Sequence, residues 1–221
     1  QFTIPFSRIE SLPRSNSTME EPVQRFTFLI LLVSFTLACQ PTDQPADSPD
    51  PGASGTAGIS VEVEADDPSV LKRPFTAEEI RDEWIEGLRL LMRRSSPEGE
   101  VVERWTVTSA DAEGVDIEFA ALDGDGQVAA DPEVRRSTWI ELRDHAAFPA
   151  ASSTREWVTR STALGNFEGW LYHVPDKESG TVSEFFFVPE FPGAPVQMRI
   201  LNGEEIMFEL EQTARLRPSS G

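Results

Sequence analysis

Between residues 59 and 214 the chain consists largely of short segments in which apolar and polar residues alternate or β-branched and aromatic residues accumulate. Such segments are typical of β-strands with one buried face. Eight of them are predicted as strands: 59–65, 101–110, 114–122, 155–162, 168–174, 181–188, 194–202 and 204–214. Several are separated only by short polar breaks such as LGN and NG. Because a parallel connection needs about a dozen residues or more, neighbours joined this tightly must be antiparallel.

A helix start interrupts the strands at Thr76 and Glu79, which have the spacing of a capping box. Apolar residues then repeat on one helical face, at positions 80, 84 and 88. Gly87 leaves two alternatives open. Either the helix breaks there and LRLLMRRSS becomes a further strand, or it continues to Arg94. We expect the break.

A second capping box, Thr138 with Glu141, opens the segment WIELRDHAA. Trp139 and Leu142 would face the sheet, and FPAA would end this helix. The predicted fold is α+β, mainly an antiparallel curved, half-barrel-like sheet with one or two short helices packed on it. From the chain length we expect one hydrophobic core.

Residues 26–38, FTFLILLVSFTLA, form an uncharged apolar run of 13 residues. A helix that crosses a membrane needs about 20 residues, so this run is short for a span. It also does not read as a core helix, because the next residues, 40–58, contain no large apolar side chain. The run is typical of the apolar part of a signal peptide.

The run ends in FTLAC, which resembles the lipobox of bacterial lipoproteins. Ala38 matches the small residue before the cleavage site and Leu37 fits, while Thr36 stands where that family usually has Leu. The resemblance implies cleavage between Ala38 and Cys39, lipidation of the Cys39 thiol and acylation of the new amino terminus. Cys39 is the chain's one cysteine, so no disulfide competes for its thiol.

These features predict four parts. Residues 1–18 are an upstream extension that is not native protein, 19–38 a signal peptide, 39–58 the lipidated cysteine with a disordered tether, and 59–221 one β-rich globular domain. The resemblance places the protein in the bacterial cell envelope. Gln40 follows the cysteine, which favours the outer membrane, facing the periplasm.

The formal charge is −19, and the first 38 residues contribute none of it. A surface this acidic repels phosphate backbones, because nucleic-acid affinity comes largely from Lys and Arg. We therefore expect no nucleic-acid partner.

The folded part loosely resembles the lipoprotein-carrier fold, in which a curved antiparallel half-barrel shelters helices and often an apolar cavity. The segment FFFVPEFPGAPVQMRILNGEEIMFELEQ carries that resemblance, and ELRDHAAFPAA resembles uncharacterised envelope lipoproteins. The resemblance implies a non-enzymatic module that binds an apolar ligand or a partner protein. The alternatives are a structural subunit of an envelope complex and an envelope hydrolase. No cofactor is expected.

Candidate catalytic residues are few. Ser69 and Lys72 have S-x-x-K spacing, but the companion motifs of the penicillin-recognising enzymes are absent. His145 follows Asp144, which could orient its ring for acid–base chemistry, although a histidine at a helix end is commonly structural. His173 lies in a predicted strand, where a sheet histidine is the expected role. No catalytic residue is assigned.

Asp123 and Asp125 in LDGDGQ suggest calcium, but the later positions of an EF-hand loop carry the wrong residues. An Asp-Gly hairpin turn is favoured, and no metal site is assigned. The aromatic residues at 185–187, Trp157 and Trp170 could line a ligand cavity, but such residues are more often core.

Overall fold

The computed structural model describes residues 67–218 and contains nine strands and two short helices in that range. The helices are α1 (Ala77–Glu83) and α2 (Trp139–Asp144). The strands are β1 (Arg89–Ser96), β2 (Gly99–Ala110), β3 (Gly114–Leu122), β4 (Glu133–Thr138), β5 (Thr154–Thr162), β6 (Gly165–Pro175), β7 (Val182–Phe187), β8 (Gln197–Asn202) and β9 (Glu205–Leu216).

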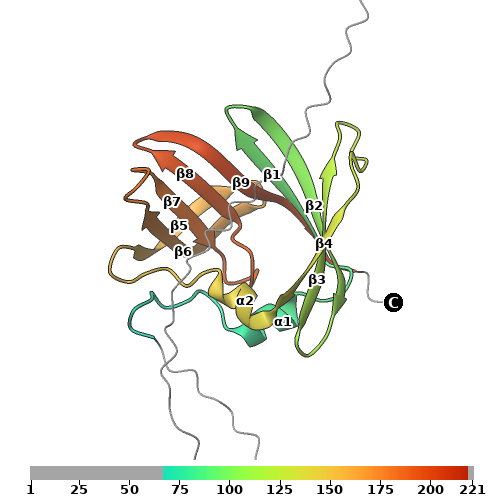
Figure 1. The fold of residues 1–221 in the computed structure, drawn as a ribbon, viewed down its shortest axis with the longest axis horizontal. Coiled ribbons are helices and arrows are strands. Elements are labelled where there is room, and N and C mark those ends of the chain that lie inside the picture. The colour runs from blue at the N-terminus through green and yellow to red at the C-terminus, as the bar shows by residue number, and fades with distance from the viewer. Residues whose placement is uncertain (1–66, 219–221) are drawn as a thin grey trace, which may run out of the picture. The chain divides into compact units, whose positions relative to one another are not determined.

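All nine strands belong to one sheet in the order β4-β3-β2-β1-β9-β8-β7-β6-β5, and every neighbouring pair is antiparallel. Two meanders, β1–β4 and β5–β9, are joined where β9 pairs with β1, which leaves β4 and β5 as the edges. Figure 1 shows the sheet curving round, with α1 and α2 side by side across its open side. The predicted fold class, a curved antiparallel sheet with two short helices, is confirmed.

Both predicted helix starts are confirmed. In each capping box the threonine hydroxyl accepts from the glutamate backbone N–H, and the glutamate carboxylate accepts from the threonine N–H. The helix after Thr76 ends at Glu83, and Gly87 has φ 84° before the chain enters β1. A left-handed backbone at Gly87 disfavours helix continuation, so the predicted break is confirmed.

The main core lies between the helices and the face of the sheet that they cover. Its buried members are Phe75, Ile80, Trp84, Leu88, Leu90, Met92, Val107, Val115, Ile117, Trp139, Ala146, Phe148, Tyr172 and Phe187. Phe148 stacks on Phe185 at 4.7 Å between ring centroids, and Phe75 and Tyr172 both pack edge-on against Phe187. Aromatic side chains therefore pack this face of the sheet tightly.

The expectation of one core was wrong, because a second, smaller core lies apart from the main one. It is formed by Leu171, Phe186, Val188 and Val196. The tip of the β5–β6 hairpin reaches back across the sheet, since the Ala163 N–H donates to the Glu211 carboxylate on β9 at 2.9 Å. Folding the hairpin over the sheet buries apolar side chains that an open sheet would leave exposed.

The sequence missed one strand, placed the start of others a few residues away, and predicted one that lies outside the described residues. Strand β4, EVRRST, was missed because its charged residues show no apolar alternation. The strand predicted from 194 begins at Gln197, because residues 189–196 form a proline-rich turn. The strand predicted at 59–65 lies outside the described residues, as do the signal-peptide and tether regions. Within residues 67–218, neither helix has the length and apolar character needed to cross a membrane.

Candidate binding groove

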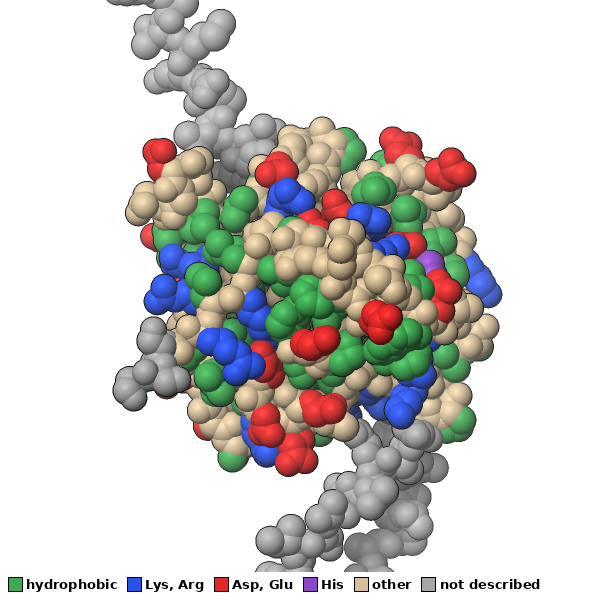
Figure 2. Space-filling model, turned by 180° about the vertical axis from the view of Figure 1, so that it is seen from behind, with side chains coloured by type: hydrophobic (Ala, Val, Ile, Leu, Met, Phe, Trp, Pro, Cys, Tyr) green, Lys and Arg blue, Asp and Glu red, His purple; other side chains and the backbone are tan. Residues whose placement is uncertain are grey.

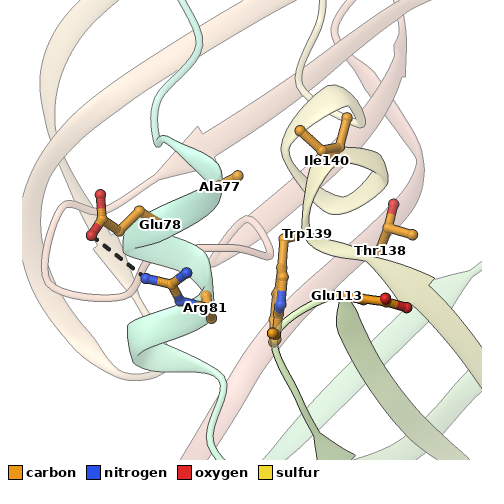
Figure 3. Close-up of a pocket in the computed structure, with 8 residues that line it drawn as sticks. Ala77, Glu78, Arg81, Glu113, Thr138, Trp139 and Ile140 are labelled. Atoms are coloured by element: carbon orange, nitrogen blue, oxygen red, sulfur yellow. Dashed lines mark ion pairs between the residues drawn. The ribbon is translucent and has the colours of Figure 1, made fainter. Parts of the chain in front are cut away.

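The larger of two surface cavities recorded among residues 67–218 is a groove of about 620 Å³ between α1 and α2. Both helices and the β2–β3 turn line it, through Ala77, Glu78, Arg81, Ala112, Glu113, Thr138, Trp139 and Ile140. Figure 3 shows Trp139 beside α1, with the Glu78–Arg81 ion pair on the side of α1 that is turned away from the indole. The lining residues come from three separate segments, so the groove exists only in the folded chain.

The groove is held in shape by the β2–β3 turn. The Asp111 carboxylate accepts from the backbone N–H groups of Glu113 and Gly114, at 2.8 and 3.0 Å. The indole N–H of Trp139 donates to the Asp111 carbonyl at 3.0 Å and ties the start of α2 to the turn. A side chain at Gly114 would meet the Ser137 carbonyl at 2.3 Å, so β3 and the end of β4, just before α2, approach this closely only with glycine there.

The groove combines an apolar floor with charged walls. Trp139 is 95% buried, whereas Ile140 is 52% exposed although it is a large apolar residue. Glu78 and Arg81 form an exposed ion pair at 3.5 Å on one wall, and Glu113 lies on the other side. Protein-binding sites combine an apolar centre with a polar rim, and the groove contains residues of both kinds.

A second cavity of about 410 Å³ lies along residues 67–76 beside Arg143. Of the predicted S-x-x-K pair, Lys72 lines this cavity and Ser69 does not, and the Ser69 hydroxyl donates to the Asp67 carboxylate at 2.8 Å. Two other lining residues, Thr76 and Glu79, are engaged with each other in the capping box of α1. The cavity therefore offers no activated serine.

The predicted pairing of Asp144 with His145 is not formed. The Asp144 carboxylate accepts two hydrogen bonds from Arg143, at 2.8 and 3.0 Å, and a further ion pair from Arg73 at 3.0 Å. His145 is exposed, caps the end of α2 and lines neither recorded cavity. His145 thus lies at the end of α2, where the sequence placed it.

His173 lies on β6 between two carboxylates, with Glu156 at 3.2 Å and Glu184 at 3.5 Å. Glu184 also accepts from Arg160 at 2.8 Å, so the histidine belongs to a row of cross-strand ion pairs. This matches the expected role of a histidine on a sheet face.

The Asp-Gly turn is confirmed at LDGDGQ. Asp123 accepts from the backbone N–H groups of Asp125 and Gln127, at 3.0 and 2.8 Å, and Gly126 has φ 75°. No group of three or more potential metal-ligating residues is found among residues 67–218. Of the candidate cavity aromatics, Phe186 and Phe187 are buried in the two cores, while Trp157 is 47% exposed on the edge strand β5.

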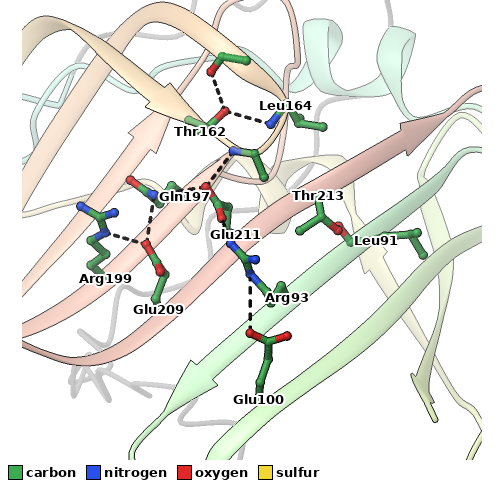
Figure 4. Close-up of polar contacts among 12 residues, drawn as sticks. Leu91, Arg93, Glu100, Thr162, Leu164, Gln197, Arg199, Glu209, Glu211 and Thr213 are labelled. Carbon is green, nitrogen blue, oxygen red and sulfur yellow. Dashed lines mark hydrogen bonds and ion pairs between the residues drawn. The ribbon is translucent and has the colours of Figure 1, made fainter. Parts of the chain in front are cut away.

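A buried polar network, not anticipated from the sequence, lies beneath the hairpin tip (Figure 4). Arg93 pairs with Glu211 at 2.5 Å, and Gln197 donates to Glu209 at 3.0 Å. Glu211 and Gln197 are 5% and 2% exposed. The cross-strand neighbours Gln197 and Glu211 are 14 residues apart in sequence, and Ala163 is a further 34 residues away, so no local sequence signal links them. The network secures the hairpin and offers no open site.

Charged side chains of both signs are interspersed with apolar ones over the face in Figure 2. The exposed large apolar residues of the described chain are Ile85, Val128, Val134, Ile140, Trp157, Ile206 and Leu216. Of these, Ile140 lines the larger cavity.

No protein-family model and no curated protein sequence matches the chain. Among solved structures, it has a distant similarity to MucB. The MucA/MucB complex of Pseudomonas aeruginosa has a TM-score of 0.45 at 13% identity, and a structure of MucB has 0.46 at 12%. The matches cover 63% and 65% of this chain but only 54% and 57% of those chains, so this chain spans about half their length.

A third similar structure is a protein of Bacteroides fragilis described as exported and as having a YmcC-like fold. Its TM-score is 0.37 at 11% identity, and the match covers 60% of this chain and 96% of that one. All three likenesses are distant and concern the fold.

Proposed function

We propose that this protein is a lipid-anchored component of the bacterial cell envelope that binds a partner protein through the groove between α1 and α2. Two sequence features support the anchor: the lipobox-like residues that end at Cys39, and the proline- and glycine-rich stretch 40–58 before the folded domain. Several acyl chains at one cysteine would give stable attachment, because each buried methylene contributes about 0.8 kcal/mol.

A partner protein fits the structure better than an apolar ligand held inside the sheet. The helix-covered face of the sheet is packed with aromatic rings, and the groove between α1 and α2 lies at the surface. An apolar ligand favours an enclosed pocket that buries most of its surface. A groove with charged walls instead suits a polypeptide, whose polar groups can pair with those walls.

The observation that carries the proposal is Ile140. It is the first residue after the buried Trp139 and is 52% exposed in the larger cavity. Its exposure costs free energy in the isolated domain, because covering apolar surface contributes about 25 cal/mol per Å². Binding of a partner in the groove would remove that surface from water.

The proposal is tested by site-specific photo-crosslinking in the native host. A photoreactive residue at Ile140 should give a discrete protein adduct, and the same residue at Val134 should not, since Val134 is 57% exposed on β4 but lies outside the groove. Arg81→Glu should weaken the adduct by reversing the charge of one wall. A lipid-only adduct at Ile140, or equal protein adducts at both positions, would contradict partner binding in the groove.

A further inference from the structure

Strand β5 leaves one edge of the sheet unpaired. It lies at the end of the sheet and, among residues 67–218, pairs only with β6 (Figure 1). Outside that ladder, no backbone hydrogen bond of residues 154–162 is found in this part of the chain. Natural proteins often blunt such an edge with a bulge or a proline, because its free N–H and C=O groups bind other strands. The pairing of β5 with β6 is continuous and β5 contains no proline, so its edge is open to a further strand.

Two copies of β5 can pair across a two-fold axis, which closes the assembly at two chains. Such an antiparallel pair is centred on one residue, which lies opposite its own copy, because directly opposite side chains point to the same face. The middle residue of Thr154–Thr162 is Val158, so a pair centred there aligns all nine residues. This register also places Glu156 of each copy opposite Arg160 of the other.

The full-length register matches side chains on both faces of the strand. On the face of the second core, two Glu156–Arg160 pairs flank Val158 and its copy. On the other face, Trp157 lies opposite Thr159, and the two Trp157 side chains are diagonal neighbours. Trp157 is about half exposed in the single chain, so pairing would cover it. Opposite charges and aromatic–β-branched pairs across strands both stabilise a sheet.

Neighbouring registers are less favourable. A centre at Trp157 or Thr159 loses both charge pairs. A centre at Glu156 or Arg160 sets like charges directly opposite each other, which destabilises the pairing. The charges of β5 therefore select the register that also gives the longest overlap.

The other edge strand, β4, does not offer such a match. It has six residues, Glu133–Thr138, so no residue lies at its centre and no symmetric register aligns the whole strand. The two registers nearest its middle place Arg135 or Arg136 opposite its own copy. Like charges in that position destabilise the pairing, so self-pairing is favoured at β5 and not at β4.

The charge of the chain limits where a second copy docks. The formal charge of −19 works against contact between acidic surfaces of two copies. Strand β5 is not acidic, because it carries Arg155 and Arg160 against Glu156 alone. Within the chain, Arg160 also pairs with Glu184 at 2.8 Å and Glu156 with His173 at 3.2 Å. A second copy would extend this row of ion pairs across the interface.

We propose that two copies of this chain pair antiparallel through β5, centred on Val158, and join their two sheets into one. The occupant of the free edge is therefore a second copy and not a strand of another protein. None of the residues that line the groove between α1 and α2 belongs to β5. The inference is independent of the proposed partner and of the anchor.

Sedimentation equilibrium of the full chain, purified from its native host in a density-matched detergent, tests the proposal. The wild type should form a dimer. Glu156→Arg replaces two opposite-charge pairs with two like-charge pairs and should raise the dimer dissociation constant about tenfold. The control Glu178→Arg makes the same charge change in the exposed turn between β6 and β7 and should leave that constant unchanged.

A photoreactive residue at the exposed position Thr159 locates the contact in an otherwise unchanged chain. It should join two copies of the chain, with the adduct in the peptide that contains Trp157. A wild type that stays monomeric and gives no such adduct would overturn the proposal, as would equal dissociation constants for Glu156→Arg and Glu178→Arg. An adduct between Thr159 and a different protein would assign the edge to a partner strand and would equally contradict it.

Discussion

At the scale of single residues, Glu83 is a nearly buried charged group with several partners. It is 8% exposed at the end of α1, and its carboxylate accepts two hydrogen bonds from Arg215, at 3.0 and 2.6 Å, and another from Arg217. Burial lowers the pKa of Arg215, and Glu83 opposes that shift. The cluster ties α1 to the last strand of the sheet.

Glu83→Gln should therefore be strongly destabilising, because it leaves the guanidinium of Arg215 buried without a counter-charge. The expected loss is roughly 3 to 5 kcal/mol of unfolding free energy. Glu78→Gln, on the same helix but exposed, should cost at most about 0.5 kcal/mol. Urea unfolding of both variants measures the difference in their free energies of unfolding. Equal midpoints would show that the buried cluster does not contribute to stability.

Gly193 shows a second constraint at this scale. It has φ 114°, and a Cβ atom there would meet the indole nitrogen of Trp84 at 2.2 Å, where that nitrogen donates to the Pro192 carbonyl. The sequence marked PEFPGAP as a turn, but which residue approaches it could not be predicted, since Trp84 lies more than 100 residues away.

At the scale of elements, the β2–β3 turn is linked to β4 by charge. Arg136 on β4 donates to the Asp111 carboxylate at 2.7 Å. That contact, with the two backbone N–H donors of the turn, holds the pKa of Asp111 below its usual value. A carboxyl group with a lowered pKa stabilises the fold above its unfolded-state pKa of about 3.9, and this stabilisation is lost as the pH falls through the folded-state value.

Asp111→Asn should accordingly destabilise the protein at pH 7, and its deficit relative to the wild type should shrink as the pH is lowered below about 3.9. Thermal unfolding measured across this pH range gives the comparison. Asp125→Asn, in the exposed β3–β4 loop, serves as the control and should leave stability unchanged. A deficit that stays constant down to the lowest pH would mean that the charge of Asp111 does not contribute.

The sequence predicted those elements in which the pattern of apolar and polar residues follows the pattern of buried and exposed positions. Alternation revealed β2, β3 and β6, and the threonine–glutamate pairs marked both helix starts. Strand β4 was not predicted, because it is held by pairing with β3 and shows no pattern of burial. Its apolar residue Val134 stays 57% exposed. The folded-over hairpin was also not predicted, since the contact of Ala163 with Glu211 is not encoded by any local pattern.

The groove was not predicted for the same reason. Its walls come from α1, the β2–β3 turn and α2, and only the fold brings Arg81, Glu113 and Ile140 together. In the sequence, Ile140 was noted only as one residue of WIEL, the start of a predicted helix. Its position beside α1 depends on Trp139 bonding to the Asp111 carbonyl.

At the scale of the whole molecule, we propose a folded domain that a tether attaches to a membrane. The formal charge of −19 arises entirely after residue 38, so the part that would remain after cleavage is strongly acidic. Its partner is expected to be a protein, because nucleic acid would be repelled. Residues 40–58 would give a root-mean-square reach of roughly 20 to 25 Å, enough for the domain to stand clear of the lipid headgroups.

The proposed anchor would decide where this domain works, and intact-mass and peptide mass spectrometry of the protein from native envelopes tests it most directly. The account predicts a mature chain that begins at Cys39 and carries acyl chains on its thiol and amino group, and a Cys39→Ser variant that lacks them and leaves the lipid fraction. A native protein whose peptide across Ala38 and Cys39 is intact, with an unmodified thiol, would contradict it.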